Sequence, residues 1–196
     1  MTGLNMAAIY IVQTLGSLYL LLVLLRFILQ LVRADFYNPI SQFIARATQP
    51  LLRPLRRVIP GFAGVDFASL VLALIVQMVL MAIIIKLMGY ALPAILQLLV
   101  WSLVGITALF LKVFFFALII SVILSWVAPH SQNPAAVLVY QLCEPVLAPI
   151  RRILPSMGGL DLSPIFAFIA LNLLDMLLVT NLAIATGMPK GLTLAL

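Results

Sequence analysis

Four long apolar stretches divide the chain. A helix that crosses a bilayer needs roughly 20 mostly apolar residues, so each stretch predicts a transmembrane helix. A short sequence, GYALPA, joins the second stretch to the third and predicts a tight turn. The pattern therefore predicts an all-α membrane protein. Its four transmembrane helices are expected at about residues 6–32, 67–88, 96–127 and 163–186.

Two polar connectors, residues 33–66 and 128–162, separate these helices into pairs. A shift of 95 residues aligns the first connector with the second. Over positions 38–66, 10 of the 29 aligned residues are identical without a gap. Such self-similarity predicts a tandem duplication of one unit: a helix, a basic connector and a return helix. The first repeat then covers residues 1–92, and the second covers residues 93–196.

Charge is concentrated in the connectors. Two spans lie between them, so both connectors are expected on one side of the membrane. By the positive-inside rule that side is the cytoplasm, and both termini lie outside it. The two hairpins then have the same orientation, as tandem parallel repeats. The connector arginines are Arg33, Arg46, Arg53, Arg56, Arg57, Arg151 and Arg152, whereas the opposite side holds Lys86 and Lys190.

Each connector also predicts an amphipathic helix in the plane of the membrane. In the first connector Ile40, Phe43, Ile44, Ala47 and Leu51 follow helical spacing, with polar residues between them. The second connector has a more apolar segment at the same place. These helices are expected to be cytoplasmic and interfacial.

The predicted ends of the connector helices follow from asparagine, proline and aspartate positions. Asn38-Pro39 and Asn133-Pro134 each place an N-cap residue before a proline at the first helical position. We expect Pro54 and Pro149 to end the regular helices, since the residue before a proline avoids the α region. A carboxylate stabilises a helix start, so two aspartates are expected to cap the return helices. They are Asp66 and Asp161.

The sequences PLLRPLRRVIP (residues 50–60) and PVLAPIRRILP (residues 145–155) lie within these hairpins. The repeated pattern resembles the YggT (YlmG-like) family of bacterial and plastid membrane proteins over nearly the whole chain. The second copy has Ala148 where the first has Arg53, so it is less basic. The motif positions, expected to form a cytoplasmic contact surface, are Asn38, Pro39, Pro50, Pro54, Arg56, Arg57, Pro60, Asp66, Asn133, Pro134, Glu144, Pro145, Pro149, Arg151, Arg152, Pro155 and Asp161.

The resemblance implies a multi-pass protein of the bacterial inner membrane without enzymatic activity. Roles discussed for the family are osmotic or ion homeostasis, cell division and envelope organisation, and assembly of cytochrome b-type complexes in plastids. The leading hypothesis is therefore an accessory or scaffold protein. The arginines predict contact with anionic lipid headgroups or with another membrane or cytosolic protein, and their alternative role is to set topology alone. A homo-oligomer is compatible with this hypothesis.

Several polar residues fall inside the predicted spans. Lys112 and Asp175 lie about 16 Å deep at 1.5 Å per residue, and we expect them to pair. The pair would serve either an ion or proton pathway or a structural salt bridge. Gln77 and Asn172 correspond between the repeats and are expected to make polar contacts between helices. Arg26, near the inner end of its helix, would extend to the interface or reach Asp35 or Asp66.

Composition excludes several function classes. Only 8% of the residues are charged, and the chain has one cysteine, Cys143, and one histidine, His130. An intramolecular disulfide is excluded, and no metal, haem or other cofactor is expected. We find no phosphate loop, catalytic carboxylate pair or nucleic-acid module. Two alternatives stay open: a small oligomeric ion transporter or channel that uses Lys112 and Asp175, and an assembly factor that transfers haem.

Overall fold

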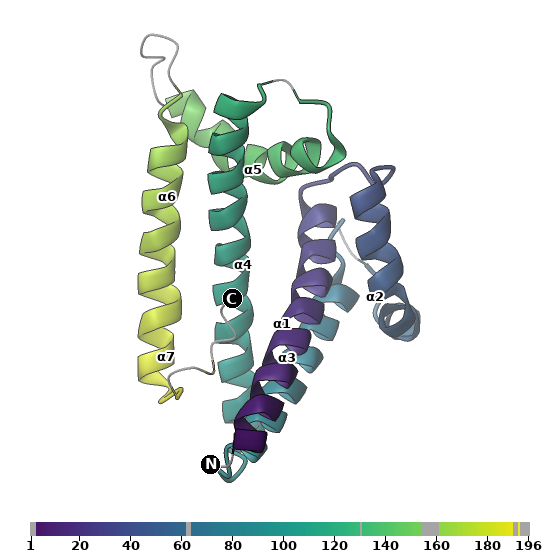
Figure 1. The fold of residues 1–196 in the computed structure, drawn as a ribbon, viewed down its shortest axis with the longest axis vertical. Coiled ribbons are helices and arrows are strands. Elements are labelled where there is room, and N and C mark those ends of the chain that lie inside the picture. Colours follow the sequence, from purple (N-terminus) through teal and green to yellow (C-terminus); the bar gives the residue numbers. More distant parts are fainter. Residues whose placement is uncertain (1–2, 62–63, 130, 154–160, 190–191, 193–196) are drawn as a thin grey trace.

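The computed structural model describes residues 3–61, 64–129, 131–153, 161–189 and 192. Within these residues the regular structure consists of helices and no β-strand (Figure 1). The elements are α1 (Gly3–Leu31), α2 (Pro39–Val58), α3 (Phe67–Leu87), α4 (Ile95–Val127), α5 (Pro134–Ile153), α6 (Ser163–Leu174), the π-helical segment η1 (Asp175–Thr180) and α7 (Asn181–Ala185).

In the described part of the chain, four helices are long and apolar enough to cross a membrane: α1, α3, α4 and the continuous run Ser163–Ala185. Their bounds agree with the predicted ones to within a few residues, which confirms four apolar helices compatible with a multi-pass membrane protein. Large apolar side chains stay exposed along all four, for example Leu15, Ile75, Ile120 and Ile169. In lipid such side chains need no cover.

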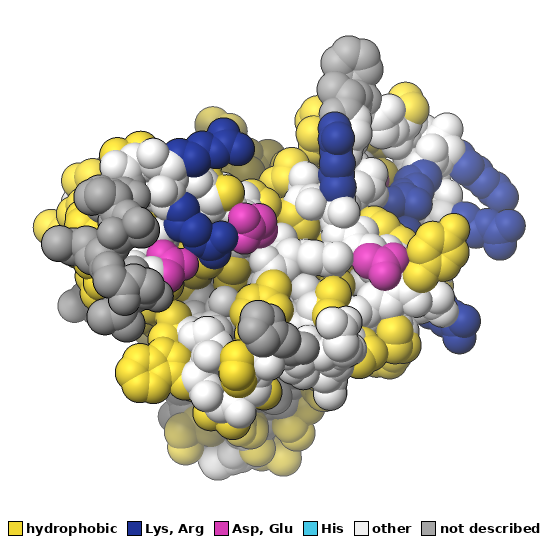
Figure 2. All heavy atoms as spheres, turned by 90° about the horizontal axis from the view of Figure 1, so that it is seen from above, with side chains coloured by type: hydrophobic (Ala, Val, Ile, Leu, Met, Phe, Trp, Pro, Cys, Tyr) yellow, Lys and Arg dark blue, Asp and Glu magenta, His cyan; other side chains and the backbone are white. Residues whose placement is uncertain are grey.

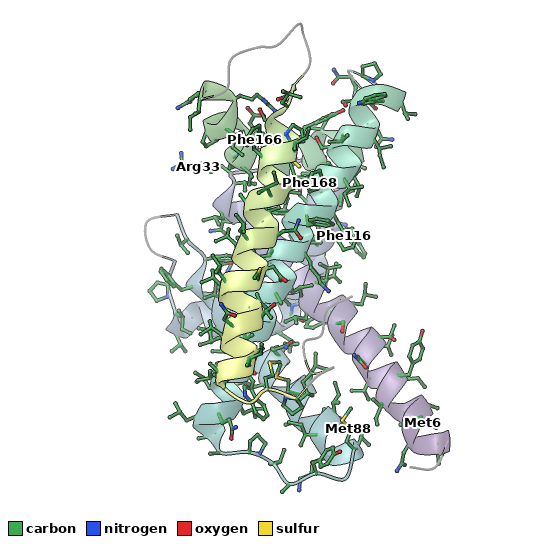
Figure 3. All side chains as sticks on the ribbon, turned by 90° about the vertical axis from the view of Figure 1, so that its left-hand side faces the viewer. Met6, Arg33, Met88, Phe116, Phe166 and Phe168 are labelled. Atoms are coloured by element: carbon green, nitrogen blue, oxygen red, sulfur yellow. The ribbon has the colours of Figure 1, made fainter. Side chains whose placement is uncertain are left out.

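The long helices pack as two pairs. α1 lies against α3, α4 lies against the run from α6 to α7, and α3 and α4 pack together and join the pairs. The first pair is inclined to the second, and α1 crosses obliquely toward Met6 (Figures 1 and 3). Leu24, Ile84 and Leu109 belong to the buried core that results.

Two glycines allow close approach between helices. A Cβ at Gly16 of α1 would overlap the side chain of Leu80 in α3. A Cβ at Gly105 of α4 would overlap the amide of Gln77 in α3. Small residues at these points let the helix backbones come close, as is common where helices pack in lipid.

The connector helices begin as the sequence predicts. Asn38 is the N-cap of α2, and its side-chain oxygen accepts a hydrogen bond from the Ile40 N–H at 2.9 Å. Asn133 accepts one from the Ala135 N–H at 2.9 Å in the same arrangement. In both helices a proline follows the asparagine, where its missing N–H costs nothing.

The predicted ends of these helices are wrong. α2 continues through Pro50 and Pro54, and α5 continues through Pro145 and Pro149. Four-residue spacing puts both prolines of a helix on one side, and all four prolines are exposed. A helix bends away from an outward-facing proline, so the chain keeps its helical form at the cost of a backbone hydrogen bond. Both ribbons bend along their length in Figure 1.

Candidate contact surface formed by the connectors

The two connectors begin at the end of the molecule opposite the α3–α4 turn (Figure 1). Seen from that end, Lys and Arg side chains gather in separate groups (Figure 2). Within the described residues, two hydrogen bonds join the connectors. The Asn38 side-chain N–H donates to the Pro134 carbonyl at 2.8 Å, and the Asp35 N–H donates to Gln141 Oε1 at 3.0 Å. Asn38 therefore caps its own helix and also holds the two connectors together.

Asp66 forms a network that closes the first connector. It is the N-cap of α3 as predicted, and it accepts hydrogen bonds from the N–H and hydroxyl of Ser69 at 3.3 and 2.5 Å. Arg56 donates to the same carboxylate and forms an ion pair with it. Burial acts to raise the pKa of Asp66, but the bonds from Arg56 and Ser69 outweigh it and hold that pKa below its ordinary value.

Asp161 forms a similar but more exposed network in the second connector. Arg151 Nε donates to Asp161 at 3.0 Å, and Arg151 Nη1 donates to Glu144 at 3.1 and 3.2 Å. The Ser163 N–H donates to Asp161 at 2.9 Å, although the N-cap of α6 is the next residue, Leu162. Burial acts to raise the pKa of Asp161, but the bonds from Ser163 and Arg151 lower it below the ordinary value.

The two networks divide the motif arginines into two kinds. The first arginine of each pair, Arg56 or Arg151, holds an aspartate 10 residues later in the chain. All four of these arginines are exposed, but Arg57 and Arg152 lie outside both networks. The spacing of 10 residues from arginine to aspartate is visible in the sequence, but spacing alone does not show that the arginine side chain turns back to the aspartate. The arginines best placed to meet a partner are Arg46, Arg53, Arg57 and Arg152.

Arg26 lies inside the molecule and fixes α2 on α1. Its guanidinium donates to the Ala45 carbonyl at 2.7 Å, to Thr48 Oγ1 at 3.0 Å and to Gln49 Oε1 at 3.2 Å. Its side chain is buried. It therefore donates to α2 and not to Asp35 or Asp66, because α2 places a carbonyl oxygen and two side-chain oxygens within hydrogen-bond distance.

In the second half of the chain, two smaller side chains occupy the positions that match Arg26 and Thr48. Ser121 and Cys143 lie 95 residues further along, and they are hydrogen-bonded to each other. Cys143 is buried, and burial raises its pKa to about 11. The Ser121 bond lowers the pKa, Glu144 raises it and Arg151 lowers it, and these effects are smaller than that of burial. The same register shift that revealed the repeat would have linked these residues.

A cavity of about 160 Å³, lined by both apolar and polar side chains, lies between α4 and the α6–η1 segment. Asp175 is the first residue of the π-helical segment, a geometry that often marks a functional site. The predicted ion pair between Lys112 and Asp175 stays a prediction. Asn172 donates to the Phe168 carbonyl of its own helix at 2.8 Å. The cavity is lined by Leu111, Lys112, Phe115, Leu171, Asn172 and Asp175.

Gln77 occupies a different environment from Asn172, although the two match in the repeats. It is fully buried where α3 meets α4, beside Gly105. Among the described residues its amide has no hydrogen-bond partner. Within that part of the chain the expected polar contact between helices is therefore not made by Gln77, and for Asn172 it stays a prediction.

His130, Pro155 and Lys190 lie outside the described residues. Pro60 follows the end of α2 and is exposed. In the described part of the chain no three His, Cys, Asp or Glu side chains lie close enough to hold a metal ion.

The family of the chain follows from its sequence relatives. The model of the family described as CCB3/YggT matches residues 5–88 and 100–182. The chain belongs to the CCB3/YggT family. Each matched range of this YggT-family chain contains one of the Arg–Asp networks. The connector surface thus lies within the part of the chain that the family shares.

Three relatives extend this assignment. The chain is 71% identical to protein PA0392 of Pseudomonas aeruginosa over the whole length of both. It is 36% identical to the YggT protein of Escherichia coli K12, over 85% of this chain and 86% of that protein. It is 39% identical to YlmG homolog protein 2 of Arabidopsis thaliana, a chloroplastic protein, over 32% of this chain and 25% of that protein. No solved structure matches the chain.

Proposed function

We propose that this YggT-family chain is a non-enzymatic accessory or scaffold protein of the bacterial inner membrane, and that its connectors form the contact surface. One observation carries the proposal. Two proline-bent helices are joined through Asn38 and Pro134, and they display exposed arginines from both repeats beside four apolar helices. A role in membrane topology needs only the positive charge of the arginines. The fixed shape of this surface is an additional feature, and it supports a role in contact with a partner.

The proposal includes a tandem arrangement of two parallel hairpins. Its support is the equal spacing of Arg56 from Asp66 and of Arg151 from Asp161, together with the asparagine caps of α2 and α5. The arginine excess in the connectors supports a cytoplasmic position for this surface. A partner bound there would be a cytosolic protein or the cytoplasmic part of another membrane protein.

Photocrosslinking in native bacterial membranes tests the proposal. A photoreactive residue replaces Arg57 in one variant and Arg152 in another, and a control variant carries it at Tyr90, beyond the end of α3. We expect the same protein adduct from both connector positions and none from position 90. Adducts from position 90 alone, or no protein adduct from either connector, would contradict the proposed contact surface.

A small transporter or channel is a second candidate, favoured by one observation. The cavity beside η1 brings Lys112, Asn172 and Asp175 together inside an apolar helix pair, where ionisable residues are functional candidates. Purified protein in liposomes would then give an ion or proton flux that Asp175→Asn reduces. Absence of flux in every oligomeric state, with the protein shown to be folded, would reject this candidate.

A further inference from the structure

Helix α2 presents three different faces. Ser41, Ile44, Thr48 and Leu52 are buried against the bundle. Between them and the water-facing side runs an exposed apolar stripe. Phe43 is 62% exposed and Leu51 is 52% exposed, and both recur at helical spacing with Ile40 and Val58.

The predicted amphipathic stripe thus divides in two. Ile44 faces the bundle, whereas Phe43 and Leu51 face outward without cover from the described part of the chain. Amphipathic helices at a membrane surface bury their apolar face at the boundary between the lipid headgroups and the acyl chains. The uncovered apolar stripe of α2 suits that position.

A basic groove lies on another side of the same helix, next to Phe43 but away from Leu51. At 3.6 residues per turn, Pro50 of the groove falls beside Phe43, whereas Arg53 falls almost opposite Leu51. It has a volume of about 430 Å³ and is lined by Ala45, Arg46, Gln49, Pro50 and Arg53. The two arginines are seven residues apart, about 10.5 Å along the helix axis, and both are exposed on the same side. Arginine side chains are long enough to reach a phosphate group placed between them, and the planar guanidinium binds such a group through paired hydrogen bonds.

Pro50 adds a hydrogen-bond acceptor to the groove. Proline has no N–H, so it donates no helical bond to the Arg46 carbonyl four residues earlier. That carbonyl lies next to residues that line the groove. A ligand that carries both an anionic phosphate and a hydroxyl donor satisfies the arginines and this carbonyl together.

We propose that this groove of α2 binds the headgroup of one anionic phospholipid of the phosphatidylglycerol class, with an acyl chain that passes Pro50 and lies along Phe43. The phosphodiester lies between Arg46 and Arg53, and a glycerol hydroxyl donates toward the Arg46 carbonyl. The inference rests on the proposed function in one respect, since it requires the connectors to face an anionic leaflet.

The matching face of α5 differs in chemistry. Gln141 and Ala148 stand where α2 has Arg46 and Arg53, and Gln141 already accepts a hydrogen bond from Asp35. Leu138 and Leu142, which match Phe43 and Ala47, are buried. The proposal therefore assigns one such lipid to each chain and none to the second repeat.

Native mass spectrometry of the detergent-purified full chain tests the site. The protein is titrated with phosphatidylglycerol and, separately, with phosphatidylcholine. We expect one preferred phosphatidylglycerol adduct. Each arginine near an anionic headgroup contributes about fivefold in affinity, so Arg46→Gln with Arg53→Gln should weaken this adduct about 30-fold. Arg152→Gln, an exposed arginine of α5, is the matched control and should leave it unchanged.

A second variant separates a specific loss of lipid binding from a loss of the fold. Arg46→Lys with Arg53→Lys keeps both charges but loses the planar fork, so it should bind with intermediate affinity, and thermal unfolding should show both variants folded. Equal binding of the two lipids, two equivalent adducts, or wild-type affinity in the glutamine variant would overturn the site. The site would also be overturned if a photoreactive residue at position 46 crosslinked to an acidic protein and the purified chain showed no preference between the two lipids.

The two proposals fail separately. Lipid binding in detergent reports on the groove whatever the partner, whereas crosslinking from Arg57 and Arg152 in membranes reports on the contact surface. Loss of the lipid preference with intact crosslinks would reject the site alone. Intact lipid binding without protein adducts would reject the contact surface alone.

Discussion

Asp66 shows how one side chain serves both helix and connector. Its carboxylate caps the first turn of α3 through Ser69 and holds Arg56 at the end of α2. The side chain is only 3% exposed, whereas the matching Asp161 is 46% exposed. A buried carboxylate depends on such partners more than an exposed one does, because water does not replace them.

Asp66→Asn should destabilise the protein by about 1–2 kcal/mol at neutral pH. Asparagine keeps the cap but loses the ion pair, and this value is at the low end for a charged hydrogen bond because Arg56 is 37% exposed and water screens it. Asp161→Asn should cost less than about 1 kcal/mol. Reversible unfolding in detergent micelles measures both, and equal losses would contradict the difference in burial.

The pH dependence has a definite sign. The pKa of Asp66 is held below its ordinary value, so its contribution to stability is complete above the ordinary carboxyl pKa of about 3.9. The contribution is lost as the pH falls through the lower folded-state pKa. The stability difference between wild type and Asp66→Asn should therefore be constant at neutral pH and shrink on acidification below about pH 4.

Cys143 should behave as a buried, unreactive thiol. Burial raises its pKa to about 11, so the unfolded thiol ionises at a lower pH than the folded one. Stability should consequently fall as the pH rises from about 8.5 toward 11, and Cys143→Ser should lack this part of the decline. Rapid labelling of the folded protein by a maleimide at about pH 8 would contradict the burial, since thiolates react and buried thiols do not.

At the scale of elements, apolar runs predicted the four long helices, because length and composition decide which segments suit a bilayer. The ends of α2 and α5 could not be predicted in this way. Pro54 and Pro149 are typical helix breakers, yet they lie on exposed faces, where a bend is tolerated. The exposure of these prolines depends on how α2 and α5 pack on the other helices, and rules based on local sequence do not describe that packing.

Gly16 should be essential for the tight packing of α1 on α3. Gly16→Ala brings a Cβ onto Leu80 and should destabilise the protein by about 1–3 kcal/mol. In a double-mutant cycle with Leu80→Ala, the combined loss should be smaller than the sum of the single losses, because the shorter side chain removes the overlap. Gly3→Ala, with open space around it, is the control. Additive losses would contradict the contact.

The prolines of α2 should matter for the position of Arg56. Pro50→Ala with Pro54→Ala restores two backbone donors and straightens the helix, which moves Arg56 away from Asp66. The penalty of Asp66→Asn should then fall in this background. Pro145→Ala with Pro149→Ala, the matched change in α5, should leave that penalty intact. An unchanged penalty in the α2 background would show that the bend does not position Arg56.

At the scale of the molecule, the repeat and the family resemblance were visible in the sequence, whereas contacts between the repeats were not. The bond from Asn38 to the Pro134 carbonyl joins residues 96 apart, and Arg26 contacts a helix 19 to 23 residues away. A repeat pattern shows which residues match, but it does not show which surfaces meet. The lipid groove of α2 likewise depends on which side of the helix the bundle covers.

The topology of the two connectors tests the central claim most directly. In a Cys143→Ser background, single cysteines replace Arg53, Ala148 or Tyr90, and a membrane-impermeant maleimide is added to spheroplasts or to inverted membrane vesicles. The account predicts that positions 53 and 148 react only in inverted vesicles and that position 90 reacts only in spheroplasts. Reaction of positions 53 and 148 from opposite sides would contradict it.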